Sequence, residues 1–470
     1  MTGMLLSYNK IQSAGVLLGP SSMIFWPFLA MVVLVPIPLG SIYPWSSTLI
    51  SVITGLLLLG WTVQAIFDPS QPAIGLKRCW PFIVPFALVA TWICIQIAPW
   101  TPESWHHPLW KTAGDVLGQQ LPGRITLDAH ESATGLMRLL TYGGIFWLAL
   151  QYGRDAKNAR RMIVALAIAG TVYAIYGLAM ELSGANLILW YEKEFYIGSV
   201  TSVFHYKNSY ATYAAMGLLC VLGLLMEAVA RRGGRNIGKV ETRRRVFTWL
   251  AEEGWIPVLG VIALASALVL SNSRAGVLSG GIGVIVLLIL LRFSHMKNAP
   301  YLLFISASSL LAIIMFFVIG GETVWDRITS IDLNWNIRLI IYDNTLKAIK
   351  DAFWGGLGSG TFEQTFLFYQ PDDMRQRALR AHNTYLENAM ELGFFGSLLM
   401  CAMIAFPALR CAKGIWHRRQ HAIYPTITLA AVAAIGSHAM LDFTIQVPAV
   451  AVTFFTLLGI GCAQSWSSRP

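Results

Sequence analysis

A histidine and two arginines of this sequence stand where apolar segments begin or end, and their types suit phosphate chemistry. His382 and Asn383 precede the apolar stretch 384–409, Arg274 lies in the short link "SNSRAG", and Arg338 lies in a long polar segment. A guanidinium binds phosphate through two parallel hydrogen bonds and stays charged in a low-dielectric site. An imidazole can accept a proton near neutral pH. Together these groups could hold a diphosphate leaving group and deprotonate an attacking hydroxyl.

Further polar residues stand near the ends of neighbouring apolar segments. We expect five of them to contact substrate: Arg377, Arg380, Asn383, Asn208 and Asp442. Each candidate also has a purely structural interpretation. His382 could cap a helix, Arg274 could extend its charge to a membrane interface, and Arg338 could lie on a solvated helix face. The structural interpretation is favoured for two other histidines, His205 and His438.

The elements that must position these residues are membrane-spanning helices. Of the 470 residues, 56% are hydrophobic and 12% charged, with a mean hydropathy of +0.58, whereas soluble domains contain about 25% charged residues. The apolar runs are about 18–24 residues long, which is the length of a membrane-crossing helix and too long for a barrel strand. We therefore predict an all-α polytopic membrane protein, with 1–470 as one integral membrane domain. About twelve spans are expected: 20–40, 47–67, 81–99, 133–152, 161–183, 207–230, 255–272, 275–292, 299–320, 386–409, 423–440 and 445–464.

The basic residues predict the orientation of these spans. The net charge of +10 is concentrated in alternate loops, a pattern that marks the cytoplasmic side rather than nucleic-acid binding. The basic segments are 77–78, 154–161, 231–245, 292–297 and 410–419. Both termini are then cytoplasmic, while the loops 100–132 and 321–385 lie on the opposite side together with His382. The six cysteines form no C-x-x-C pair and suggest neither a disulfide framework nor a zinc site.

The loop 321–385 is too long to be a simple connection and is expected to carry structure and function. Its apolar residues recur at helical spacing and predict an amphipathic helix against the bundle or the membrane surface: Trp335, Leu339, Tyr342, Leu346, Ile349 and Phe353. The glycine-rich stretch 355–362 lacks the lysine of a nucleotide-binding loop and is predicted to be a turn. Gly393 and Gly396 are expected to let a neighbouring helix approach closely.

The stretch from His382 to Gly396 resembles the bacterial O-antigen ligase and O-antigen polymerase superfamily. His382, Asn383, Gly393 and Gly396 occupy the four defined positions of the pattern H-[NSQ]-x9-G-x-x-[GTY]. The arginine of "SNSRAG", the region around Arg338 and "LDFTIQVPA" also look like that superfamily. The resemblance covers about residues 200–460, while the first third agrees only in its pattern of spans.

The resemblance implies a glycosyltransferase of the GT-C type that inverts the anomeric carbon without a metal or other cofactor. Its donor would be a glycan on undecaprenyl diphosphate, and its acceptor either lipid A–core or a second lipid-linked glycan. His382 would be the general base, while Arg274 and Arg338 would bind the diphosphate. The protein would lie among the lipids of the bacterial inner membrane with its site facing the periplasm, and it would not bind nucleic acid.

Two other functions use similar residues. A lipid-linked oligosaccharide flippase or polysaccharide transporter could use a basic cavity, although the internal repeats and broken midplane helices typical of transporters are not evident. A membrane O-acyltransferase also uses a histidine, but it draws its acyl donor from the cytoplasm, and His382 is predicted on the other side.

Overall fold

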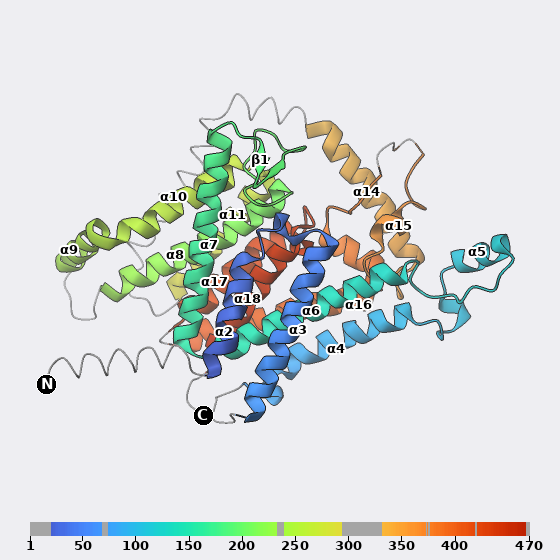
Figure 1. The fold of residues 1–470 in the computed structure, drawn as a ribbon, viewed down its shortest axis with the longest axis horizontal. Coiled ribbons are helices and arrows are strands. Elements are labelled where there is room, and N and C mark those ends of the chain that lie inside the picture. The colour runs from blue at the N-terminus through green and yellow to red at the C-terminus, as the bar shows by residue number, and fades with distance from the viewer. Residues whose placement is uncertain are drawn as a thin grey trace.

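The computed structural model describes residues 20–67, 74–232, 239–293, 331–372, 374, 377–418 and 421–466, and within them the chain is mostly helical (Figure 1). One two-stranded antiparallel sheet, β1 (Leu187–Ile188) and β2 (Tyr191–Glu192), interrupts the helices and was not expected. The α-helices are α2 (Pro20–Leu34), α3 (Pro44–Phe67), α4 (Leu76–Ile97), α5 (Leu109–Leu117), α6 (Ala129–Tyr152), α7 (Ala156–Leu182), α8 (Lys207–Arg232), α9 (Lys239–Trp249), α10 (Trp255–Leu270), α11 (Arg274–Phe293), α14 (Ile331–Asp351), α15 (Phe362–Phe366), α16 (Thr384–His417), α17 (Ile423–His438) and α18 (Pro448–Gln464).

Most of the predicted spans coincide with helices. Within the described residues, eight helices are long and apolar enough to cross a membrane, and they include α3, α4, α6, α7, α8, α11 and α16. The eighth, Glu252–Leu270, contains α10. The shorter apolar helices α2, α17 and α18 overlap three further predicted spans, while the predicted span 299–320 lies outside the described residues. The multi-pass helical class is confirmed, and the full number of spans stays a prediction.

The bundle is organised around α8, which is almost wholly enclosed. Helices α7, α10, α11 and α17 pack directly against α8, and α18 packs against α6 and α17. Glycines allow the closest of these approaches: a Cβ on Gly170 of α7 would lie 3.1 Å from the Cα of Gly217 on α8. Small residues at such crossings are how membrane helices gain van der Waals contact without a hydrophobic driving force between them.

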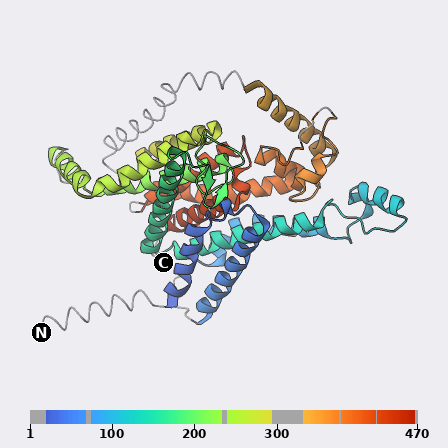
Figure 2. The ribbon, with the colours of Figure 1, turned by 45° about the horizontal axis from the view of Figure 1, so that its top comes forward.

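The extramembrane elements predicted for opposite sides lie at different ends of the molecule. Figure 1 shows α9, from the basic segment 231–245, at the left end, with α5, α14 and α15 toward the right, and Figure 2 preserves this separation after rotation. The described part of the loop 321–385 has its own small core, in which Ile341, Phe362, Phe366 and Ala381 pack with Met390 of α16. The loop is therefore structured and attached to the helix that follows it.

The predicted amphipathic helix exists as α14, and its apolar residues are divided between a packed face and an exposed face. Leu339 and Leu346 are 47% and 44% exposed, whereas Ile341, Thr345 and Ala348 are buried. Ile341 and Ala348 belong to the core that α14 shares with Phe362, Phe366 and Met390. A pattern of large apolar residues overlooks such a face, because large side chains can remain at a lipid-facing or interfacial surface.

Helix α16 is broken at Gly393, which has the left-handed value φ 71°. The carbonyls freed by the break find other partners: Leu357 N–H donates to Met390 O, Gly358 N–H donates to Glu391 O, and Trp92 Nε1 donates to Leu392 O. The prediction that Gly393 lets a neighbouring helix approach closely was therefore wrong. A Cβ at Gly393 would collide with the carbonyl oxygen of Trp354, in the turn after α14, rather than with a neighbouring helix. The glycine is needed for its backbone conformation as well as for its small size.

Gly396 fits the expectation better. A Cβ at this position would stand 3.4 Å from the Trp92 ring of α4, and α4 and α16 pack side by side. The glycine-rich stretch 355–362 forms the predicted turn, and its amides are taken up by a buried carboxylate. Gly360 N–H and Phe362 N–H donate to the two oxygens of Glu391, at 2.8 and 3.1 Å.

Candidate active site

His382 lies one residue before the cap of α16, in a left-handed backbone conformation with φ 51°. Such a conformation is uncommon for a residue other than glycine and persists only where neighbours hold it. Tyr342 Oη of α14 donates to the carbonyl of His382 at 3.0 Å, and Thr384 N–H donates to Ala439 O at 2.8 Å. Asn383 caps α16 through Oδ1, which accepts from the N–H groups of Tyr385 and Leu386.

The imidazole of His382 is held by Asp442. The distance from His382 Nδ1 to Asp442 Oδ1 is 3.2 Å, and the same oxygen accepts from Phe443 N–H at 2.8 Å. Asn208 Nδ2, at the start of α8, donates to the other carboxylate oxygen. Asp442 is buried, whereas a third of the His382 side chain remains exposed. Three predicted site residues that are far apart in the sequence therefore meet at one carboxylate.

This environment keeps Asp442 ionised. Burial would raise the pKa of the Asp442 carboxyl, but the hydrogen bond and positive charge of His382, with the Phe443 N–H, outweigh it and hold the pKa below its usual value. An ionised carboxylate on Nδ1 fixes the imidazole tautomer with its proton on that nitrogen, leaving Nε2 unprotonated. Within the described residues, His382 Nε2 has no hydrogen-bond partner. It is the nitrogen available to an incoming hydroxyl.

Aromatic rings border the imidazole. Phe443 meets His382 edge-on, with the ring centroids 5.3 Å apart, and Tyr206 packs edge-on against Phe443 at 5.5 Å. Burial raises the pKa of the Tyr206 phenol, Arg380 opposes the shift and Asp442 adds to it, so this ring lies within reach of both charges. Tyr206, Phe443 and Tyr342 were not predicted as site residues, because single aromatic residues at helix ends are common in membrane proteins.

The two arginines predicted to bind phosphate are placed by different elements. Arg338, partly buried on α14, donates from Nη1 to Leu441 O at 3.0 Å, which brings its guanidinium next to the Asp442 turn. Arg274 is exposed and begins α11. The turn before it packs on the segment leading to α8, where Val200 N–H donates to Leu270 O at 2.8 Å. The structure thus joins Arg338 to the histidine cluster directly.

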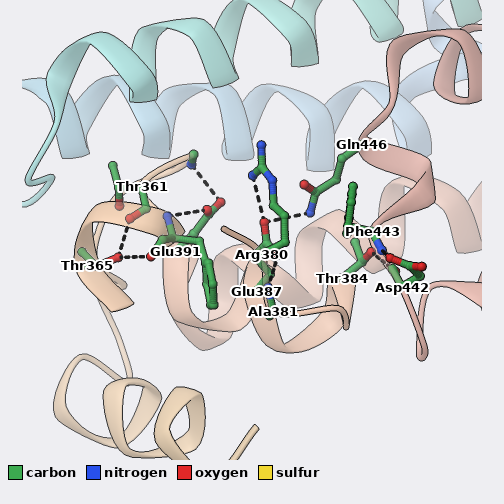
Figure 3. Close-up of polar contacts among 12 residues, drawn as sticks. Thr361, Thr365, Arg380, Ala381, Thr384, Glu387, Glu391, Asp442, Phe443 and Gln446 are labelled. Carbon is green, nitrogen blue, oxygen red and sulfur yellow. Dashed lines mark hydrogen bonds and ion pairs between the residues drawn. The ribbon is translucent and has the colours of Figure 1, made fainter. Parts of the chain in front are cut away.

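The other predicted substrate contacts already have protein partners. Arg380 pairs with the buried Glu387 of α16 at 3.1 Å, and Gln446 Nε2 donates to the same oxygen at 3.0 Å (Figure 3). Ala381 N–H donates to the second oxygen of Glu387 at 3.0 Å, which fixes the residue before His382. Arg377 forms a more exposed pair with Glu363, at 3.0 Å. The role of these arginines as substrate contacts stays a prediction, as does that of Asn383, whose amide nitrogen alone is available.

Comparison with known proteins gives a family match. The O-antigen ligase family model matches residues 259–401, which include Arg274, Arg338, His382 and the break at Gly393. This match supports the resemblance of the chain to the O-antigen ligase and polymerase superfamily. No curated protein matches the chain. The family match supports a glycosyl-transferring enzyme of lipopolysaccharide biosynthesis, and the family implies a lipid-linked glycan and lipid A–core as partners in general terms. Together with the apolar helices, it suggests a multi-pass protein of the inner membrane.

The family match covers the part of the chain that carries His382, Arg274 and Arg338, but the contacts of the site extend beyond it. Asp442, Phe443 and Gln446 follow the matched residues, and Asn208 and Tyr206 precede them. The described residues contain no group of three or more side chains of the histidine, cysteine, aspartate or glutamate type that could hold a metal ion.

Proposed function

We propose that this protein transfers a glycan from undecaprenyl diphosphate to a hydroxyl acceptor at the periplasmic face of the inner membrane. The observation that supports this most is the His382–Asp442 pair, in which Nδ1 is held at 3.2 Å and Nε2 is left without a partner. The acceptor hydroxyl belongs either to lipid A–core or to a second lipid-linked glycan. Both acceptors need the same base, and ligase and polymerase roles are both compatible with the site.

The reaction is a single displacement. His382 Nε2 takes the proton of the acceptor hydroxyl as its oxygen forms a bond to the anomeric carbon, and the bond from that carbon to the diphosphate oxygen breaks on the opposite side. The anomeric configuration is inverted, and undecaprenyl diphosphate leaves with the electron pair. Asp442 stabilises the imidazolium that forms.

Arg338 and Arg274 neutralise the charge that develops on the diphosphate. Guanidinium groups suit this task because their planar donor arrangement matches phosphate oxygens and because they stay charged at any physiological pH. No metal is needed in this scheme, because the arginines supply the positive charge. The same proposal includes a GT-C-like arrangement. In it, the site lies on an extramembrane face of the bundle beside a long structured loop.

A transfer assay in detergent tests the proposal, because flipping has no meaning without a membrane. Purified His382→Ala enzyme is given lipid-linked donor and acceptor, and donor binding is measured separately. We expect the rate to fall by about 10²–10⁴-fold, the usual effect of removing a general base, with donor affinity largely kept. His130→Ala, which removes an exposed histidine from the first turn of α6, is the control. Substantial turnover by His382→Ala would overturn the assignment of the base and favour a transporter.

A further inference from the structure

A second cluster of cations lies at the other end of α16 from His382. A cavity of about 500 Å³ is lined by Arg410, Lys413, His417, Arg418 and Ser465. The first four residues come from the last two turns of α16 and the residue after it, and Ser465 follows α18. The proposed glycosyl transfer uses none of these residues.

The arginines of this cavity are held rigidly by the end of the chain. Arg410 Nη2 donates to Ser465 O at 2.7 Å, and Arg418 Nη1 donates to Gln464 O at 2.6 Å. The Arg410 guanidinium also lies over the Trp466 ring, 5.0 Å from its centroid. These partners are neutral carbonyls and a ring, so they position the guanidinium groups without cancelling their charge.

A comparison with another basic cavity shows why this charge is unusual. That cavity, of about 430 Å³, is lined by Arg160, Arg231 and Arg232, but also by Glu227 and Glu253. Glu227 accepts from Arg160 and from Arg231, both at 2.7 Å, so two of these three arginines are paired with a carboxylate. In the cavity at the end of α16 no carboxylate is present among the lining residues. Within the described part of the chain, no ion pair joins Arg410, Lys413 or Arg418 to an acidic side chain.

Aromatic residues indicate at which level of the membrane the cavity lies. Trp416 is 53% exposed beside it, and Trp80, near the start of the adjacent α4, is 64% exposed. Phe82 of α4 packs against Trp466 at 6.1 Å, which brings this end of α4 to the cavity. Exposed tryptophans gather at the level of the lipid headgroups, and basic pockets between helices at that level bind acidic headgroups.

We propose that the cavity lined by Arg410, Lys413, His417 and Arg418 binds the phosphate of an anionic phospholipid headgroup. The two arginines are held by the carbonyls of Gln464 and Ser465, and Lys413 adds a third cation, which pairs with no acidic side chain of the described ranges. His417 Nδ1–H donates to the Lys413 carbonyl at 2.8 Å, which holds the imidazole at the lining of the cavity. A bound headgroup would tie the end of α16 to α18.

The test uses the full-length protein in nanodiscs of phosphatidylcholine, with or without phosphatidylglycerol. The thermal midpoint and the number of phosphatidylglycerol molecules retained by native mass spectrometry are both measured. Lys413→Gln is the main variant, because the Lys413 side chain forms no ion pair within the described residues. Its loss should weaken phosphatidylglycerol retention by about fivefold, the effect of one cation near an anionic surface, and Lys413→Glu should weaken it further. Arg244→Gln, which removes an exposed arginine from α9, is the matched control.

Each outcome bears on the proposal. Stabilisation by phosphatidylglycerol that the Lys413 variants lose and the Arg244 variant keeps supports it. A separate arm adds inorganic phosphate to phosphatidylcholine nanodiscs: stabilisation there, without any from phosphatidylglycerol, overturns the lipid source while keeping a phosphate site. Equal retention of phosphatidylglycerol by Lys413→Glu, Arg244→Gln and the wild type would overturn the site altogether.

Discussion

Replacing Asp442 with asparagine tests how much the rate of transfer depends on the orientation and tautomer of His382, since the histidine itself is kept. The carboxylate accepts from three donors, namely His382 Nδ1, Asn208 Nδ2 and the Phe443 N–H. An asparagine has one oxygen and one NH₂ group in the same space, so one former donor must face another donor. If the NH₂ group faces Nδ1, the histidine is driven to the tautomer that carries its proton on Nε2. That tautomer cannot accept a proton from the acceptor hydroxyl.

The magnitude follows from what the carboxylate does in the transition state. A hydrogen bond to a charged group contributes about 1.5–3 kcal/mol, so losing the Asp442 bond to the developing imidazolium should slow transfer by about 10- to 150-fold. The unfavourable tautomer lowers the active fraction further. We expect the Asp442→Asn turnover number to fall by about 10²–10³-fold in total, with donor affinity nearly unchanged because the arginines remain.

The assay is transfer from a purified lipid-linked donor in detergent, with donor binding measured in parallel. Asp343→Asn makes the same chemical change in an exposed carboxylate of α14 that pairs with Lys347 at 3.2 Å, and it should transfer at the wild-type rate. Wild-type turnover by Asp442→Asn would refute the reasoning, because the imidazole would then need no carboxylate. Equal loss of turnover and donor affinity would instead assign Asp442 to substrate binding.

Asp442 also makes stability depend on pH in a defined direction. Its folded pKa lies below its usual value, so the ionised form stabilises the folded protein above the unfolded pKa of about 3.9, and this contribution is lost as pH falls through the folded pKa. The difference in thermal midpoint between the wild type and Asp442→Asn should therefore be constant from neutral pH down to about pH 5 and shrink below about pH 4. A difference that grows on acidification would contradict the assignment.

Three other perturbations have defined outcomes. Arg274→Lys and Arg338→Lys should fold but transfer about 10- to 100-fold more slowly, because an ammonium cannot replace a bidentate guanidinium; wild-type rates in both would show that neither arginine binds the diphosphate. Gly393→Ala should lower the free energy of unfolding by about 2–4 kcal/mol, through strain at φ 71° and collision with Trp354 O. The control Gly281→Ala places its new methyl with no atom within 4 Å and should not destabilise the protein. Equal thermal midpoints for the two variants would contradict this prediction. Excess EDTA should leave transfer unchanged, and activity lost to the chelator and restored by Mg²⁺ would show that a metal takes part.

The sequence predicted the helices well because their signal is local. Runs of apolar residues at the length of the bilayer define a span without knowledge of its neighbours, and the eight long helices of the described residues match eight predicted spans. The packed face of α14 was not predictable in the same way. Which face packs depends on Phe362, Phe366 and Met390, and these partners reach it only through the fold.

The site was predicted as a set of residues but not as a set of contacts. His382 and Asp442 are 60 positions apart, and Asn208 is 234 positions from Asp442. No spacing rule connects such residues, so the bonds of Asp442 to His382 and Asn208 were not predicted, and its contact with substrate stays a prediction. Glu387 was not singled out at all, since a glutamate in the first turn of a helix is ordinary, yet both its oxygens brace the residues before His382.

The break in α16 gives a physical reason for the wide spacing of the motif. If α16 were continuous through Gly393, the carbonyls of Met390 and Glu391 would bond within the helix, and the turn at 355–358 would lose the acceptors that hold it. That turn follows α14, whose Tyr342 and Arg338 reach the His382 carbonyl and the Asp442 turn. A glycine eleven residues after the histidine therefore helps to place α14 over the imidazole. Of the four motif positions, His382 bonds to Asp442, Asn383 caps the helix, Gly393 breaks it and Gly396 packs it against α4.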